Sequence, residues 1–215
     1  MELTYHAEVP MIHELRIYTL AQGTLREYIE FQEALARPIR GDRYGKLLEY
    51  WTAMSGEPSR VVHLWEYTSF EERLRLRAEL AANPRWKDEY SPRSHPIIER
   101  QENAILLPVP DWNSSYQEGS SYESELRFIT LRPGGVPKWI ARARAEPAGS
   151  PSRPARAWTI EVGQLNTVVG LWRGSQTEGP PLLAEPTLST FIIRLRATQL
   201  SPFRSSAGRT AGAGG

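Results

Sequence analysis

The chain has 215 residues, of which 40% are hydrophobic and 10% aromatic, a composition typical of a globular protein that buries a substantial core. It contains no cysteine, which excludes disulfide bonds, a thiol nucleophile and cysteine-ligated metal sites. The 26 basic and 25 acidic residues nearly balance, so no overall positive charge indicates binding to nucleic acid or to an anionic membrane. No apolar stretch reaches about 18 residues, and the N-terminal sequence does not resemble a targeting segment, so we expect a cytoplasmic protein.

The first half of the chain predicts the element order β-α-β-β-α-β. Alternating or apolar runs predict strands over residues 13–20, 46–54, 60–67 and 99–107. Helical spacing of apolar residues covers 24–37, where Pro38 is expected to end the helix, and a second helix begins at Thr68 or Ser69. This order is that of the ferredoxin-like unit.

Three sequence blocks recur in the second half in the same order. ELRIYTL (14–20) returns as ELRFITL (125–131), and VVHLW (61–65) returns as VVGLW (168–172). Trp51-Thr52 likewise returns as Trp158-Thr159. These matches predict an internal duplication of the first unit.

The predicted organisation is therefore a first unit at 12–108, a Pro- and Ser-rich linker at 109–121, and a second, degenerate unit at 122–200. The second unit has a short helix at 136–145 and a final strand at 189–199. Its segment 174–188 is too short and too rich in proline to hold the second helix, and residues 201–215 are expected to be a disordered tail.

Several of these residues resemble the NIPSNAP family of dimeric α+β-barrel proteins. The resemblance rests on ELRIYTL, YWT, VVHLWEY, SFEER and QENAILLP in the first unit, and on ELRFITL, the PGG turn, WTIEVGQLN and VVGLW in the second. It implies an α+β fold in which two tandem ferredoxin-like units form one barrel within the chain, with helices outside and a cavity between the two sheets. It also implies a fold shared with cofactor-free monooxygenases, isomerases and cyclases.

Strand alternation sorts the side chains into two faces. We expect the apolar set, which includes Leu15, Ile17, Leu126 and Phe128, to meet the helices. The opposite set would then face the cavity between the sheets. That set comprises Glu14, Arg16, Tyr18, Tyr50, His63, Trp65, Tyr67, Glu125, Arg127, Glu161, Trp172, Arg194 and Arg196.

Three of these residues are candidate catalytic groups because the other repeat has a different residue at each position. His63 corresponds to Gly170, which would leave a titratable base on one wall and empty space on the other. We expect His63 or Glu161 to act as a general base and Tyr18 to donate a hydrogen bond to a developing oxyanion. The alternative is that His63 is a structural hydrogen-bonding residue.

The remaining cavity residues are candidates for substrate binding. They are Arg16, Arg127, Arg194 and Arg196, which would hold an anionic group, and Trp65, Trp172 and Tyr50, which would form the walls. The alternative is that the arginines only form internal ion pairs with Glu14 and Glu125.

Two functions remain open at this point. The first is a cofactor-independent isomerase, cyclase or monooxygenase-like enzyme that acts on an anionic, partly aromatic or polyketide-like metabolite. The second is a non-catalytic binding or scaffold protein that docks a second copy or another protein on the uncovered second sheet, unless 174–188 covers that sheet as a lid. A cavity smaller than a few hundred Å³ would favour the second. The sequence contains no nucleotide-binding motif, and its four histidines do not have metal-ligand spacing, so we expect no cofactor and no metal.

Overall fold

The protein is described by a computed structural model that covers residues 11–55, 59–110, 112, 123–148, 150–174 and 187–202. Its eight antiparallel strands form a closed barrel in the order β1-β3-β2-β8-β5-β7-β6-β4. The strands are β1 (Ile12–Leu20), β2 (Lys46–Ala53), β3 (Arg60–Tyr67), β4 (Ile98–Pro108), β5 (Glu123–Leu131), β6 (Arg156–Val162), β7 (Thr167–Arg173) and β8 (Thr187–Ala197).

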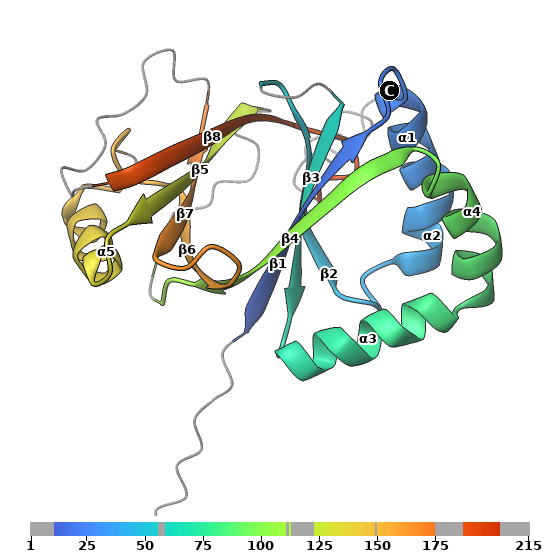
Figure 1. Cartoon of the computed structure of the whole chain (residues 1–215), viewed down its shortest axis with the longest axis horizontal. Coiled ribbons are helices and arrows are strands. Elements are labelled where there is room, and N and C mark those ends of the chain that lie inside the picture. The colour runs from blue at the N-terminus through green and yellow to red at the C-terminus, as the bar shows by residue number, and fades with distance from the viewer. Residues whose placement is uncertain are drawn as a thin grey trace, which may run out of the picture.

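Helices cover the outer surface of the barrel unequally on its two sides. They are α1 (Leu25–Phe31), the π-helical segment η1 (Gln32–Ala36), α2 (Arg37–Arg40), α3 (Phe70–Ala82), the π-helical segment η2 (Trp86–Tyr90), α4 (Ser91–Ser94) and α5 (Gly135–Ala145). Figure 1 shows α1 to α4 gathered beside β1–β4, which we call the first half. In the second half, β5–β8, α5 is the one helix among the described residues and lies at the opposite end of the molecule (Figure 1).

Each half has the same internal strand order, β4-β1-β3-β2 in the first and β8-β5-β7-β6 in the second. The fold is a mixed α+β structure rich in strands, as the sequence predicts, and the observed strand limits lie within two residues of the predicted ones. Pro38 does not end the first helix, so that expectation is wrong. It lies in the first turn of α2, which follows the π-helical segment η1 directly, so the helical run continues past it.

Apolar side chains fill the inside of the barrel. Buried there are Leu15, Leu48, Trp51, Val62, Leu64, Leu106, Leu126, Trp158, Ile160, Val169, Leu171, Ile193 and Leu195. An eight-stranded barrel is just wide enough for such side chains to meet across its axis. The prediction that Leu15 and Leu126 meet the helices is therefore wrong: the apolar face points into the barrel, and the mixed polar face points outward.

The halves meet along two short seams. At one seam β2 pairs with β8 over three residue pairs, and at the other β4 pairs with β6 over four. A polar contact accompanies each seam. Arg173 donates a hydrogen bond to the buried Glu49 carboxylate at 2.6 Å. The same carboxylate also accepts a hydrogen bond from the Ser201 hydroxyl at 2.7 Å. The Trp158 indole donates to His13 Nδ1 at 2.9 Å.

Helix α5 packs on the outer face of the second half through a cluster that includes Leu131, Trp139, Ala143 and Trp172. Residues 175–186, on which both the lid and the uncovered-sheet expectations depend, lie outside the described residues, as do most of the predicted linker and tail. None of the helices in the described ranges is long and apolar enough to span a membrane.

The Glu49–Arg173 contact is expected to contribute strongly to the stability of the closed barrel. Replacing Glu49, which is 1% exposed, in Glu49→Gln removes the charge that compensates the guanidinium of Arg173. The free energy of unfolding should fall by about 3 kcal/mol in urea denaturation, because one partner of a buried ion pair is lost. Glu30→Gln, which breaks the exposed Arg26–Glu30 pair, is the control and should change it by only about 0.3 kcal/mol. Equal effects of the two substitutions would contradict this account.

Candidate functional site

A pocket of about 180 Å³ lies between the outer face of the first half-sheet and helices α1 to α4. Five of the predicted site residues line it, namely Arg16, Tyr18, Tyr50, His63 and Trp65. The sequence therefore grouped these side chains correctly. It placed them wrongly, because they lie under the helices and not between the two half-sheets.

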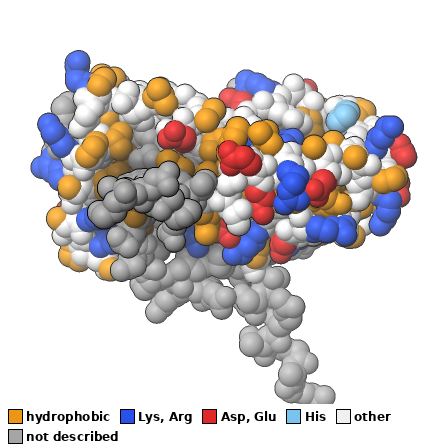
Figure 2. Space-filling model, turned by 90° about the horizontal axis from the view of Figure 1, so that it is seen from below, with side chains coloured by type: hydrophobic (Ala, Val, Ile, Leu, Met, Phe, Trp, Pro, Cys, Tyr) orange, Lys and Arg blue, Asp and Glu red, His pale blue; other side chains and the backbone are white. Residues whose placement is uncertain are grey.

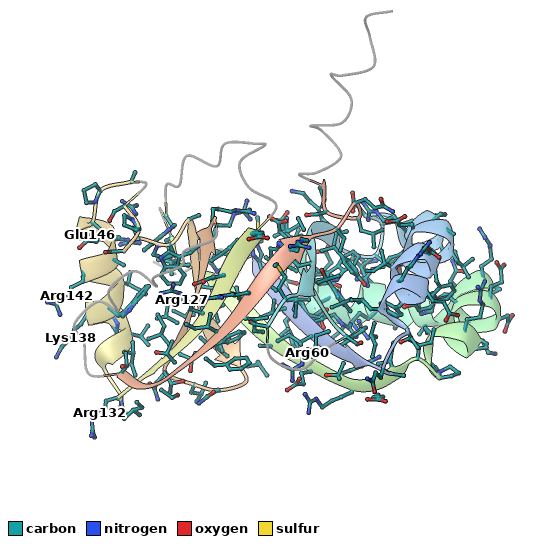
Figure 3. All side chains as sticks on the ribbon, turned by 90° about the horizontal axis from the view of Figure 1, so that it is seen from above. Arg60, Arg127, Arg132, Lys138, Arg142 and Glu146 are labelled. Carbon is teal, nitrogen blue, oxygen red and sulfur yellow. The ribbon has the colours of Figure 1, made fainter. Side chains whose placement is uncertain are left out.

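The other predicted site residues do not reach this pocket. Arg127, Glu161, Trp172, Arg194 and Arg196 belong to strands of the second half. Figure 3 shows Arg127 in the half that carries α5, apart from the helices that cover the pocket. The predicted convergence of residues from both halves on one cavity is therefore wrong.

His63 occupies the centre of an aromatic cage in the pocket. Its ring stacks on Tyr50 with centroids 5.0 Å apart and meets Tyr18 edge-on at 4.8 Å. The Trp65 indole N–H donates to His63 Nδ1 at 2.5 Å. The ring is thus fixed on three sides, and its Nε2 atom is buried without a hydrogen-bond partner among the described residues.

The surroundings keep His63 neutral. Burial lowers the pKa of His63 well below the usual 6.5, and the nearby cations Arg16 and Arg40 lower it further. A histidine with so low a pKa is a weak proton acceptor near neutral pH. The expected role of His63 as a general base therefore has no support in this geometry, whereas a neutral ring can still donate one hydrogen bond.

Below the cage, Glu14 is the carboxylate that balances part of the positive charge. It is fully buried, accepts from Arg73 at 2.5 Å and from Asn103 at 3.3 Å, and lies 3.5 Å from Arg16. Burial acts to raise the pKa of Glu14, but Arg16 and Arg73 outweigh it and hold the pKa below its usual value. The expected Glu14–Arg16 pairing is present, with Arg73 as an additional partner that sequence reasoning missed.

Arg40 is a buried cation whose described partners are all uncharged. It donates to the Tyr44 carbonyl at 3.2 Å and to the Tyr67 hydroxyl at 3.1 Å. Its guanidinium lies over the Trp65 ring, 3.3 Å from the ring centroid. Burial lowers the pKa of Arg40, and Arg16 adds to the effect. Sequence reasoning missed this residue because it belongs to the helical segment beyond Pro38, where no helix was expected.

The charge of the pocket lining is strongly one-sided. Four arginines line it, Arg16, Arg37, Arg40 and Arg77, and the described lining residues include no aspartate or glutamate. By contrast, basic and acidic side chains are mixed on the outer surface seen in Figure 2. Carboxylates just outside the lining pair with two of these arginines, Glu14 with Arg16 and Asp42 with Arg37, so the buried lining cation without a described carboxylate partner is Arg40.

Aromatic residues form much of the remaining wall, and two π-helical segments carry part of it. Tyr90 of η2 stacks on Trp86 at 3.9 Å and accepts a hydrogen bond from Gln32 of η1 at 2.9 Å. The extra residue in a π-helical turn changes which side chains face inward, and such turns are frequent at functional sites.

Tyr18 remains protonated over the physiological range. Burial raises the pKa of Tyr18 to about 12, although Arg16 acts in the opposite direction. Its hydroxyl is therefore available as a hydrogen-bond donor at neutral pH, which is the chemical property that its proposed role requires.

In the second half, the positions that correspond to His63 and Arg16 are Gly170 and Arg127, and their surroundings differ. A Cβ at Gly170 would lie 2.4 Å from the Trp172 ring, so that ring already occupies the space beside Gly170. The expectation of empty space there is wrong. Arg127 is 2% exposed and donates to Glu125 at 2.5 Å, while its guanidinium lies 4.7 Å from the Trp172 ring centroid.

The last three predicted site residues are exposed. Glu161 lies exposed near the end of β6, so its expected role as a base has no support. Arg194 forms an ion pair with Glu125 at 3.4 Å and Arg196 forms one with Glu123 at 3.0 Å. For these arginines the ion-pair alternative describes the structure better than ligand binding.

The fold as a whole is that of the dimeric α+β-barrel class. A candidate monooxygenase from Fusobacterium nucleatum is 10% identical over 88% of this chain and 93% of its own, with a TM-score of 0.59. An anthrone oxidase-like protein is 9% identical over 89% of this chain and 92% of its own, with a TM-score of 0.55. At such low identity these similarities show the fold alone.

Sequence similarity gives the family. Residues 13–112 match the NIPSNAP family. A NIPSNAP-like domain protein from Burkholderia xenovorans is 37% identical, covering 47% of this chain and 87% of that protein, with a TM-score of 0.45. Protein NipSnap homolog 3A from Homo sapiens is 28% identical over 167 residues, 75% of this chain, and the match spans 66% of the human protein. The chain belongs to the NIPSNAP family.

The low pKa of His63 gives a testable pH dependence. Below pH 6.5 the His63 ring binds a proton in the unfolded chain but not in the folded state. Protonation of His63 therefore lowers the free energy of unfolding as the pH falls. His63→Phe should therefore lose less stability than the wild type between pH 7 and pH 5 in thermal unfolding. NMR should show His63 titrating well below the midpoint of a free imidazole, and a midpoint near 6.5 would contradict the assignment.

Proposed function

We propose that the first-half pocket binds a small, planar organic anion and that the protein is a cofactor-independent enzyme acting on that anion. The observation that carries the proposal is Arg40, a buried cation on the lining whose contacts among the described residues include no carboxylate, whereas Arg16 is paired with Glu14 and Arg37 with Asp42. Buried cations are costly unless an opposite charge accompanies them, so a bound anion would complete the site. The aromatic side chains Tyr18, Tyr50 and Trp65 favour a flat, partly aromatic or polyketide-like ligand.

The chemistry would rest on stabilising negative charge on a ligand oxygen. A phenol or enol bound beside Arg16 and Arg40 ionises at a lower pH than in water, because nearby cations favour the anion. The bound phenolate or enolate is then the reactive species for isomerisation, ring closure or direct reaction with oxygen. A preorganised donor in such a site contributes about 10²-fold or more to the rate.

The roles of the individual residues follow from their protonation states. Neutral His63 and protonated Tyr18 would donate hydrogen bonds to the developing oxyanion, while Arg16 and Arg40 would hold it in place. Trp65 and Tyr50 would form the walls. Arg127, Arg194, Arg196, Trp172 and Glu161 have no part in this proposal, since they belong to the other half.

The second candidate function is a non-catalytic binding protein, and two observations favour it. The volume of about 180 Å³ is below the few hundred Å³ of common small-molecule sites. The described lining also lacks a carboxylate that could act as a base. Native mass spectrometry of the freshly purified protein tests both functions together. An unchanged retained ligand supports binding alone, and conversion of that ligand on incubation supports the enzyme.

Two further assignments belong to the same proposal. The shared strand order of the halves supports tandem ferredoxin-like units at 12–108 and 122–200. A homodimer or another protein partner remains a proposal, which the subunit count in the same mass spectrum tests.

Removing the uncompensated cation should weaken anion binding. Arg40→Gln is expected to lower the affinity for benzoate, used as a small planar probe, by about 10-fold to 100-fold, because a hydrogen bond to a charged group is lost. Isothermal titration calorimetry measures the change. Arg132→Gln, an exposed substitution in the second half, is the control and should leave the affinity unchanged. Equal affinities for wild type and Arg40→Gln would remove the basis of the proposal.

A further inference from the structure

Three buried nitrogen atoms on the pocket lining have no hydrogen-bond partner among the described residues. They are Arg16 Nε, Arg40 Nε and His63 Nε2. The Tyr50 hydroxyl on the same lining is also unpartnered among the described residues, but it can donate or accept. Buried polar groups in folded proteins nearly always find a partner, so these orphan atoms on one pocket call for an explanation. An arginine Nε always carries a hydrogen, and thus two of the three are donors.

The third atom is a donor as well, because Trp65 determines where the His63 proton sits. An indole N–H can only donate, so His63 Nδ1, which lies 2.5 Å from Trp65 Nε1, must accept. A ring whose Nδ1 accepts cannot be the imidazolium form, and its single proton is on Nε2. The orphan atom of His63 is therefore an N–H, directed away from Trp65.

Trp65 also positions a second donor. The Arg40 guanidinium rests on the Trp65 ring at 3.3 Å from the centroid. One side chain thus fixes two of the three orphan donors. The counterpart Trp172 lies against Gly170 and has no histidine beside it, and the guanidinium over its ring is that of Arg127, which is paired with Glu125.

We propose that these three donors form a subsite for an anionic oxygen group that carries no hydrogen, such as a carboxylate, phenolate or enolate, and that Trp65 is its positioning residue. This inference rests on the proposed anion-binding function and narrows the ligand class. A neutral amide of the same shape brings N–H groups against the donors and gives Arg40 no anionic partner. The subsite should therefore discriminate strongly against it.

The first test needs no ligand. NMR of ¹⁵N-labelled protein should show neutral His63 with its proton on Nε2 in the wild type. Trp65→Phe keeps a buried aromatic ring but removes the indole donor, and it should allow the Nδ1–H tautomer. Trp172→Phe is the matched control in the second half and should leave the His63 signals unchanged. A wild-type His63 that carries its proton on Nδ1, or that is an imidazolium, would overturn the proposal even if Trp65→Phe failed to fold.

The second test compares two probes of equal shape. Benzoate should bind the wild type at least 10-fold more tightly than benzamide in calorimetry. Trp65→Phe should reduce that ratio, and Trp172→Phe should preserve it. Equal affinities for the two probes would overturn the subsite even with the Nε2–H tautomer in place.

The two proposals can fail separately. If the tautomer and the benzoate preference are both found but no retained ligand is converted, the subsite stands and the catalytic part of the proposed function fails. If a retained ligand is converted but benzamide binds as tightly as benzoate, the enzyme stands and the acceptor-only subsite fails.

Discussion

The narrow bore of an eight-stranded barrel is the constraint on which the rest of this structure depends. Side chains from opposite strands meet across the axis, so only a dry, apolar interior packs well. Every strand position that alternates with that interior set must then point outward. In the first half this outward face carries Glu14, Arg16, His63 and Tyr67, and helices α1 to α4 cover it, so these polar side chains are buried.

Helical cover turns that outward face into a buried polar layer, and the two halves complete it in different ways. In the first half the buried arginines Arg16 and Arg73 pair with the Glu14 carboxylate, Arg40 lies on the pocket beside them, and the helices enclose a pocket. The second half balances Arg127 directly with Glu125, and the Trp172 ring occupies the space beside Gly170. The same strand pattern thus gives an open, positively charged site on one side and a filled, neutral one on the other.

Much of the fold could be predicted from the sequence, because strand alternation and the recurring ELRIYTL and VVHLW blocks are local signals. Strand alternation also predicted that Arg16, Tyr18 and His63 share one face of the sheet. It could not tell which way that face points, since this depends on whether helices or the opposite sheet bury the apolar set. Arg40 could not be predicted for a different reason: the helical run continues from the π-helical segment η1 into α2 past Pro38, and no pattern in the sequence indicates this.

A crystal structure of the protein with benzoate tests the central claim most directly, because it locates the anion. The account predicts the carboxylate in the first-half pocket, within hydrogen-bond distance of Arg16, Arg40 and His63 Nε2, and no benzoate beside Arg127. Benzoate inside the barrel between the half-sheets, or bound beside Arg127 or Arg194 in the second half, would contradict it.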